Sequence, residues 1–408
     1  MRPPFEKNGD AVALELSLKM PKNDIPVINL TKIPDHRLIS YGQLKAVEHA
    51  EKRISGDEIV FIILSSGSTG KPKAVCISHT NIITSALAQM REFGAPKSSC
   101  MDDVYLHYFP VNHVSGAIEW GFAPLVSGST IVICDKFDPA LALQMVGEFR
   151  VSILAGVPTM WKKIFSNADL CKSDLSSIRW CATGGMPSDE VTIKRILDIC
   201  GRCSNPLGLT ETSGFCSFFN GESDIKRLTH TIGHIIPELQ YKILRADSKE
   251  CENGEIGHLC YRGQSVATRY LSAQMPIDDN GYFDSGDLAS ESSDGYIYFW
   301  GRSDDMFITG GYNVYPTEIE QVMMNYPGVN AAIVFPVQHS TMGAVPQALV
   351  VPENSRTREF DVSGLTKYLE DRLLYYKIPR RIEIVDSLPM TTLGKIARIT
   401  RQKDKRFK

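Results

Sequence analysis

Residues 65–75 read SSGSTGKPKAV, between the apolar run EIVFIIL and the segment CISHTNIITSALAQM. Small residues leave backbone N–H groups free to approach phosphate oxygens. Serine and threonine hydroxyls add donors, and Lys71 and Lys73 add positive charge. The run is not a Walker A loop, because that pattern needs a glycine at Ser65 and a hydroxylated residue at Pro72. Taken alone, it is either a phosphate-binding loop or a Ser/Gly-rich surface loop.

The composition indicates several folded domains. The chain has 408 residues, 43% of them hydrophobic, and about 100–200 residues per domain predicts two or three domains. Its 44 basic and 47 acidic residues give a net charge of −3, which provides no electrostatic footprint for nucleic acid. The sequence has no apolar run of about 18 residues for a membrane span, no secretory signal and no Ser-Lys-Leu ending. We therefore expect a cytoplasmic protein without a membrane span.

The ten cysteines are scattered along the chain, as reduced cytosolic thiols usually are. Cys200 and Cys203 form a C-x-x-C pair. A zinc site would need a second pair or nearby histidines at ligand spacing, and none is evident. The pair is therefore interpreted as two ordinary thiols at a helix end.

Strand-like and helix-like segments alternate from residue 59 onward. We expect strands at 58–64, 129–135, 151–157 and 178–185, and helices near 81–91, 137–149, 159–166 and 188–200. Asp138 can cap its helix, with Pro139 in the first turn. This alternation predicts a mainly parallel sheet with crossovers, whose ligands lie at the carboxyl ends of the strands. The glycine-rich segments 65–70 and 183–185 are expected at that edge.

The pattern changes after about residue 230. Runs at 238–244, 255–263 and 295–302 are separated by the turn sequences ENG, DNG and SDG, which predicts an antiparallel, barrel-like unit. A smaller α+β segment follows, with expected strands near 329–337, 346–352 and 381–385 and a helix near 361–375. The predicted fold class is α/β, with a large domain over 1–303 and a smaller C-terminal lid domain over 304–408.

Eight motifs in register make the chain similar to the adenylate-forming (AMP-binding) enzymes, in particular acyl-CoA synthetases and 4-coumarate–CoA ligase. They are SSGSTGKPKAV (65–75), FPVNHVSGAIEWG (109–121), CATGGMP (181–187), NPLGLTETSG (205–214), GEIGHLCYRGQSVATRYL (254–271), YFDSGDLA (282–289), GRSDDMFITGGYNVYPTEIE (301–320) and LPMTTLGKIARIT (388–400). The resemblance implies that a carboxylate attacks the α-phosphate of ATP, pyrophosphate leaves, and a thiol such as coenzyme A then displaces AMP.

The resemblance also implies a phosphate and magnesium site. The β- and γ-phosphates would be held by the loop residues Ser65, Ser66, Gly67, Ser68, Thr69, Gly70 and Lys73. Thr210 would hydrogen-bond phosphate and Glu211 would ligate Mg²⁺, a hard cation that shares oxygen ligands with substrate phosphates. The plain alternative for Glu211 is a solvated loop acid.

Other motifs would hold the nucleoside. Asp287 resembles the acid that accepts both ribose hydroxyls, and Arg302 would contact the same ribose. Alone, either would be a turn aspartate or a surface arginine. The adenine slot would be lined by Gly184, Gly185, Met186, Asn205, Leu207 and Gly208. Leu207 stands where the family usually has an aromatic residue. The leucine cannot stack on adenine, which costs about 1 kcal/mol.

The C-terminal motifs imply a moving domain. Lys395 matches the catalytic lysine that bridges the acyl carboxylate and the phosphate, and closure of the lid must bring it into the site. Asp304 matches the hinge, while Gly310 and Gly311 would face the pantetheine arm of CoA. His113 matches the residue that gates the acyl pocket, the alternative being a core histidine.

The acyl pocket is expected to include 113–121 and the segment SGFCSFF after Thr212, so a hydrophobic acid is favoured.

Two other departures from the family motifs are mild. Ser285 replaces the threonine of TGD, and Ala74 replaces the glycine of PKG. The second replacement matters only if residue 74 needs a positive φ. Relative to the family, we expect about 100 residues before the phosphate loop to be missing. Their loss would expose apolar surface and favour self-association.

These observations predict an ATP-dependent acid–CoA ligase using ATP, Mg²⁺ and CoA. Two alternatives remain open. The chain could adenylate an acid for a carrier protein or a luciferase-like oxidation, or it could be a truncated, catalytically idle nucleotide-binding protein.

Overall fold

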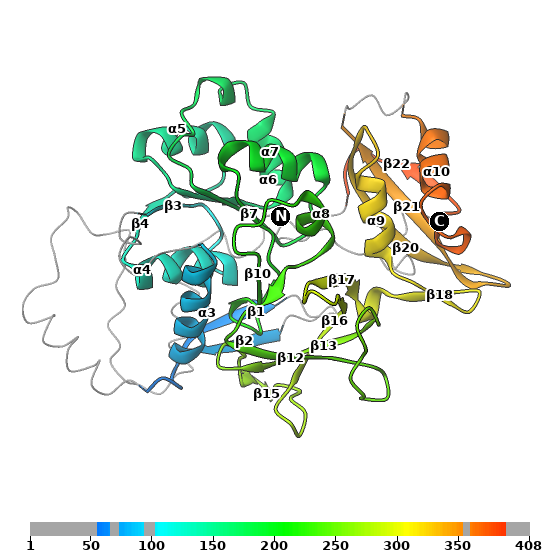
Figure 1. Cartoon of the computed structure of the whole chain (residues 1–408), viewed down its shortest axis with the longest axis horizontal. Coiled ribbons are helices and arrows are strands. Elements are labelled where there is room, and N and C mark those ends of the chain that lie inside the picture. Colours follow the sequence, from blue (N-terminus) through cyan, green and yellow to red (C-terminus); the bar gives the residue numbers. More distant parts are fainter. Residues whose placement is uncertain (1–54, 66–72, 94–102, 354–359, 389–408) are drawn as a thin grey trace, which may run out of the picture. The chain divides into compact units, whose positions relative to one another are not determined.

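The computed structural model of the chain describes residues 55–65, 73–93, 103–353 and 360–388 (Figure 1). Over these ranges the chain alternates between helices and strands that form several separate sheets. No helix in the described ranges combines the length and the apolar character needed to cross a membrane.

A five-stranded parallel sheet has the order β4-β3-β5-β6-β7. Its strands are β3 (Val104–His107), β4 (Thr130–Ile133), β5 (Ile153–Gly156), β6 (Trp180–Thr183) and β7 (Cys203–Ser204). Its crossovers contain η4 (Ser115–Phe122, a π-helix), α4 (Ala123–Ser127), α5 (Pro139–Phe149), α6 (Pro158–Phe165), η5 (Leu170–Lys172) and α7 (Glu190–Cys200). Asp138 caps α5 by accepting a hydrogen bond from Leu141 N at 2.9 Å. The predicted parallel sheet, with crossovers, is confirmed.

The prediction that the run 58–64 belongs to this sheet is wrong. β1 (Ile59–Ser65) pairs antiparallel with β2 (Lys73–Ser78), and Ser65 stands opposite Lys73. The sheet continues through β14 (Arg269–Tyr270) to β15 (Ala273–Gln274). β1 and β2 are therefore antiparallel neighbours in this sheet, and α3 (His79–Glu92) follows β2. Ala74 lies within β2 and does not have a positive φ, so its substitution for glycine carries no backbone strain.

A four-stranded antiparallel sheet has the order β12-β13-β16-β17. Its strands are β12 (Leu239–Leu244), β13 (Gly257–Gly263), β16 (Phe283–Glu291) and β17 (Ile297–Arg302). The glycines of ENG, DNG and SDG adopt φ of 82°, 85° and 81°, as their turns require. Four short strands, β8 (Gly208–Leu209), β9 (Gly214–Phe215), β10 (Ser217–Phe218) and β11 (His234–Ile235), form two pairs, and α8 (Ile225–His230) precedes β11.

The C-terminal segment contains a five-stranded sheet in which β19-β18-β21-β20 are neighbours and β22 pairs with β21. Its strands are β18 (Phe307–Thr309), β19 (Tyr312–Val314), β20 (Val329–His339), β21 (Gly343–Pro352) and β22 (Ile382–Ile384). Its helical elements are η6 (Ser303–Asp305), α9 (Pro316–Met324), α10 (Val362–Glu370) and η7 (Tyr375–Lys377). Helix α10 ends at Glu370, five residues earlier than expected, and η7 follows after a short connection.

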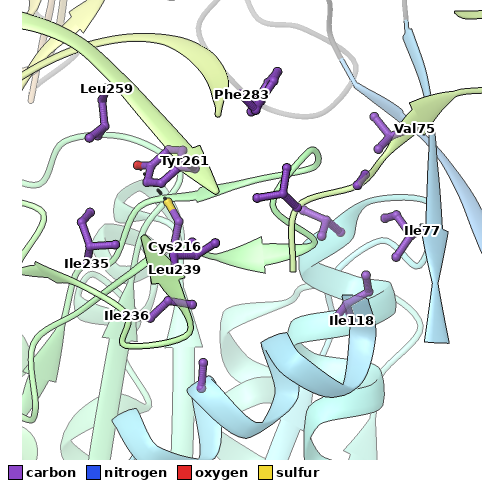
Figure 2. Packing of buried hydrophobic residues seen from close by; sticks show 14 of the residues in the cluster. Val75, Ile77, Ile118, Cys216, Ile235, Ile236, Leu239, Leu259, Tyr261 and Phe283 are labelled. Atoms are coloured by element: carbon purple, nitrogen blue, oxygen red, sulfur yellow. Dashed lines mark hydrogen bonds between the residues drawn. The ribbon is translucent and has the colours of Figure 1, made fainter. Parts of the chain in front are cut away.

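One buried cluster joins the antiparallel sheets to the π-helix. Figure 2 shows Val75 and Ile77 of β2, Ile118 of η4 and Tyr261 of β13 among its members. Cys216 donates a hydrogen bond to the hydroxyl of Tyr261 at 3.3 Å within this cluster. Each large apolar side chain removed from water contributes about 1.5–3 kcal/mol. The cluster therefore fixes β1 and β2 beside the segment that carries the LGLTE motif.

Candidate functional site

Two motifs that lie 146 residues apart meet at a hydrogen bond. Ser65, at the end of β1, donates from Oγ to Glu211 Oε1 at 3.0 Å. Tyr270 of β14 donates its hydroxyl to the same oxygen at 3.5 Å. The Lys73 ammonium lies 5.3 Å from the centre of the Tyr270 ring. The start of the predicted phosphate loop, its far end and the predicted magnesium ligand thus share one small region.

The backbone around Glu211 is held on both sides. Glu211 O accepts from Ala267 N at 2.9 Å, and the carbonyl of buried Thr210 accepts from Ser213 N at 3.1 Å. The Thr212 hydroxyl donates to Gly214 O at 2.8 Å. These bonds place Thr210 and Glu211 at the tip of the short hairpin between β8 and β9.

Ser213 adopts a φ of 59°, a left-handed conformation that is uncommon for a residue with a Cβ. Its hydroxyl is buried and has no partner among the described residues. Backbone strain of this kind is found most often where the chain positions functional groups. Its place two residues after Glu211 agrees with that tendency.

Asp287 and Arg302 form an ion pair between the neighbouring strands β16 and β17, in which Asp287 is buried and Arg302 is half-buried. Arg302 Nη1 donates to Asp287 Oδ1 at 2.8 Å and to Ser285 O at 2.6 Å. Asp287 is 1% exposed, and its Oδ2 has no partner among the described residues. Burial raises the pKa of Asp287, although Arg302 acts in the opposite direction.

The same arginine is electrostatically linked to Glu211. Burial disfavours the charge of Arg302, but Asp287 and, more weakly, Asp304 and Glu211 raise its pKa. Arg302 in turn slightly opposes the pKa rise of Tyr270, which burial and then Glu211 bring to about 12. The Asp287–Arg302 pair and the Ser65–Glu211 contact therefore belong to one region with alternating charges.

The residues predicted for the adenine slot approach one another. Gly184, Gly185 and Met186 follow β6, and Gly185 has a φ of 78°. A Cβ added to Gly184 would lie 3.4 Å from Pro206 O, so this turn runs beside the segment with Leu207. A Cβ on Gly208 would come within 3.0 Å of Glu119 Oε1. The turn therefore approaches this segment through a glycine backbone.

Asn205 is already engaged in the fold. Its side chain is buried, and Nδ2 donates to Leu228 O at 2.9 Å. Leu207 is half-buried and packs against the main cluster. Asn205 therefore has a structural partner of its own, and any part in nucleotide binding would come in addition to it.

His113 lies just before the π-helix η4. It is half-buried, and its Nδ1 accepts a hydrogen bond from Ser115 N at 3.2 Å. On the same helix Glu119 and Trp120 are both buried, and the Trp120 ring lies 6.4 Å from that of Phe215 in an edge-on arrangement. The wall expected for the acyl pocket therefore combines aromatic surface with one carboxylate.

The C-terminal candidates occupy turns. Asp304 is exposed within η6. Gly310 and Gly311 connect β18 to β19 with φ of 56° and 89°, and a Cβ on Gly310 would lie 2.5 Å from Met342 Cε. Both glycines are thus explained by the turn alone. The remaining candidates lie outside the described residues: Ser66, Gly67, Ser68, Thr69, Gly70 and Lys395.

Sequence reasoning assigned no role to two residues of this region. Tyr270 lies within the motif at 254–271, and its aromatic hydroxyl could have marked it as a hydrogen-bond donor. Glu92 ends α3 and carried no signal; its carboxylate accepts from Ser204 Oγ, from Phe219 N at 3.0 Å and from Asn220 N at 2.9 Å. Glu92 therefore fastens both ends of the segment 205–218, which carries the LGLTE motif.

The fold and these motifs define the class of protein. Residues 8–271 match the AMP-binding enzyme family, and residues 318–395 match the AMP-binding enzyme C-terminal domain. The chain belongs to this family, as its motifs predicted, and the expected enzyme class is confirmed with it.

Among the relatives is a feruloyl-CoA synthase of Amycolatopsis sp., 30% identical over 363 residues, which cover 87% of this chain and 72% of that protein. A 2-succinylbenzoate–CoA ligase of Bacillus licheniformis is 30% identical, covering 84% of this chain and 69% of that protein. The solved O-succinylbenzoate coenzyme A synthetase of Bacillus subtilis, in complex with AMP, matches with a TM-score of 0.75 and 27% identity, covering 86% and 70%. These matches support the mixed α/β fold with a smaller C-terminal domain.

Proposed function

We propose that the chain activates a carboxylic acid with a largely apolar body as its acyl adenylate and then forms the CoA thioester. The underlying enzyme class, an AMP-forming carboxylate–CoA ligase that uses ATP and CoA, rests on the family match and on the CoA ligases among the relatives. The observation that carries the site proposal is the Ser65–Glu211 hydrogen bond, which joins the first motif to the LGLTE motif.

The phosphate end of ATP would lie beside Ser65 at the end of β1 and Lys73 at the start of β2. In the described ranges, His, Cys, Asp and Glu side chains form no group of three that could hold a metal ion. A single carboxylate, Glu211, suits Mg²⁺ when substrate phosphates and waters complete the coordination. The metal would neutralise charge on the phosphates, while Ser65, Thr210 and Lys73 would orient them.

The ribose would bind at Asp287. A buried carboxylate with one oxygen on Arg302 and one without a partner offers an acceptor to a hydroxyl donor. The adenine would lie by Gly184, Gly185, Met186 and Leu207. We assign residues 1–303 to the AMP-binding core and 304–408 to a mobile C-terminal domain carrying Lys395, with Asp304 as hinge and Gly310 and Gly311 on the CoA path.

Aromatic side chains of the expected acyl wall support an acid with an apolar body. His113 would gate the pocket that receives this acid. The relatives act on acids as different as feruloyl and 2-succinylbenzoyl compounds. An aromatic lining favours an uncharged body, because burying a second carboxylate of the substrate against apolar surface is costly.

Pyrophosphate–ATP exchange with fatty, aromatic and dicarboxylic acids tests adenylation directly. We expect exchange with fatty or aromatic acids, little with dicarboxylic acids, and release of a CoA thioester when CoA is added. Exchange without thioester formation would point to a carrier protein or an oxidation as the second step. Absence of exchange with every acid would overturn the proposal in favour of an idle nucleotide-binding protein.

A further inference from the structure

Two cysteines from different elements lie side by side. Cys200 is the last residue of α7 and Cys181 lies in β6, and their sulfur atoms are 3.7 Å apart. The partner suggested by the C-x-x-C spacing, Cys203, is in register with Cys181 on β7, but its thiol donates to Ser204 O at 3.7 Å. The contact in space is therefore between Cys181 and Cys200, which the sequence spacing does not reveal.

The two thiols have different surroundings. Cys200 is half-buried, and Cys181 is fully buried. The hydrogen bond with Cys181 lowers the pKa of Cys200 to about 7, helped by the backbone and charge of Arg202 and opposed by burial. Burial raises the pKa of Cys181 well above its ordinary value. Near neutral pH, one thiol is thus partly ionised and reachable, and its neighbour is protonated and protected.

We propose that Cys200 and Cys181 form a peroxide-reactive thiol pair that closes reversibly into a disulfide. The Cys200 thiolate attacks hydrogen peroxide, breaks its O–O bond and becomes a sulfenic acid, and hydroxide leaves. The Cys181 sulfur then attacks the sulfenic sulfur, and the S–O bond breaks. Water leaves with the Cys181 proton, and the S–S bond forms. A dithiol reductant returns both thiols by exchange.

Closure requires little movement. A disulfide has an S–S bond of about 2.05 Å, so the two sulfur atoms must approach by roughly 1.7 Å. Cys200 ends its helix, and Gly201 follows with a φ of 69°, so the moving sulfur is carried at a helix terminus next to a glycine. The bond would join α7 to the strand whose end leads into Gly184 and Gly185.

The test uses the reduced full-length chain, treated with hydrogen peroxide, alkylated and digested with trypsin without reduction. Trypsin separates the three thiols into peptides 180–194, 196–202 and 203–226. We expect mass spectrometry to find 180–194 linked to 196–202, and dithiothreitol to abolish the link. Exposed Cys171, a free thiol, provides the control.

Variants separate the two steps. Cys200→Ser should prevent the link, and Cys181→Ser should leave a sulfenic acid on Cys200 that dimedone captures, while Cys171→Ser changes neither. If Cys181→Ser fails to fold, iodoacetamide alkylation of the wild-type chain still reports the first step: the rate at Cys200 should rise with a midpoint near pH 7. A link between 196–202 and 203–226, or an unmodified Cys200 at peroxide exposures that oxidise Cys171, overturns the proposal.

Discussion

Replacing Asp287 by asparagine separates what this residue does for binding from what it does for folding. The side chain is 1% exposed, with Oδ1 on Arg302 Nη1 at 2.8 Å and Oδ2 without a partner among the described residues. Asparagine keeps the shape and the acceptor facing Arg302. It removes the negative charge and turns the second oxygen into a donor, which cannot accept a ribose hydroxyl.

The expected loss of nucleotide binding follows from that one contact. A hydrogen bond to a charged group contributes about 1.5–3 kcal/mol, and every 1.4 kcal/mol is about tenfold in affinity. The KM for ATP in pyrophosphate exchange should therefore rise roughly 10- to 150-fold. The limiting exchange rate should change far less, because the ribose does not react.

The same substitution should weaken nucleotide binding but should not lower the stability of the folded chain. Burial raises the pKa of Asp287 above its ordinary value of 3.8, so the folded chain binds this proton more tightly than the unfolded chain does. Its contribution to stability is complete at acid pH and is lost as pH rises through the raised pKa. Asp287→Asn lacks that loss, so its melting temperature at pH 7 should equal or exceed the wild-type value.

A surface pair provides the matched control. Asp294 and Arg227 are 3.3 Å apart, with exposed fractions of 54% and 44%, and Asp294→Asn should change neither the KM nor the melting temperature. If Asp287→Asn left the KM for ATP within about twofold of wild type, the ribose assignment would be wrong. A large fall in melting temperature would contradict the stated cost of the buried charge.

Three further predictions concern other parts of the site. Glu211→Gln keeps an acceptor for Ser65 but removes the metal-binding charge, so the Mg²⁺ concentration for half-maximal exchange should rise roughly tenfold or more; an unchanged value would place the metal elsewhere. Lys395→Ala should lower the exchange rate roughly 100-fold while AMP binding, measured by calorimetry, persists; intact exchange would show that another residue has this role. Glu92→Gln puts an amide donor against backbone N–H groups of Phe219 and Asn220, so urea denaturation should show a loss of about 1–3 kcal/mol; a loss under about 0.5 kcal/mol would refute its fastening role.

The sequence predicted the parallel sheet well and the first sheet badly, for a physical reason. β5 and β6 are continuous apolar runs followed by amphipathic helices, a pattern typical of a parallel sheet. β2 is a short strand that runs directly into α3, so its residues look like the start of the helix. Its partner β14 lies nearly 200 residues later, and no local pattern signals a pairing of that range.

The residues of the candidate site also divide into those that the sequence could predict and those that it could not. Glu211 and Asp287 were predicted only because their motifs resemble those of a family, and nothing local distinguishes them from solvated loop acids. Glu92 shows the limit: a single glutamate at a helix end becomes a buried acceptor of several hydrogen bonds only because two distant segments fold around it. Such a role depends on tertiary packing, which residue type and spacing do not encode.

The charges of the described region also limit how ATP can bind. The positive charges of Lys73 and Arg302 are matched by the negative charges of Glu211 and Asp287, and Arg302 is already paired with Asp287 at 2.8 Å. A triphosphate added to this balanced set brings an excess of negative charge into a partly buried space, where repulsion is poorly screened. In the proposed arrangement, Mg²⁺ on Glu211 together with Lys395 supplies compensating charge. Removing magnesium should therefore weaken the binding of ATP much more than the binding of AMP, because AMP carries less negative charge to compensate.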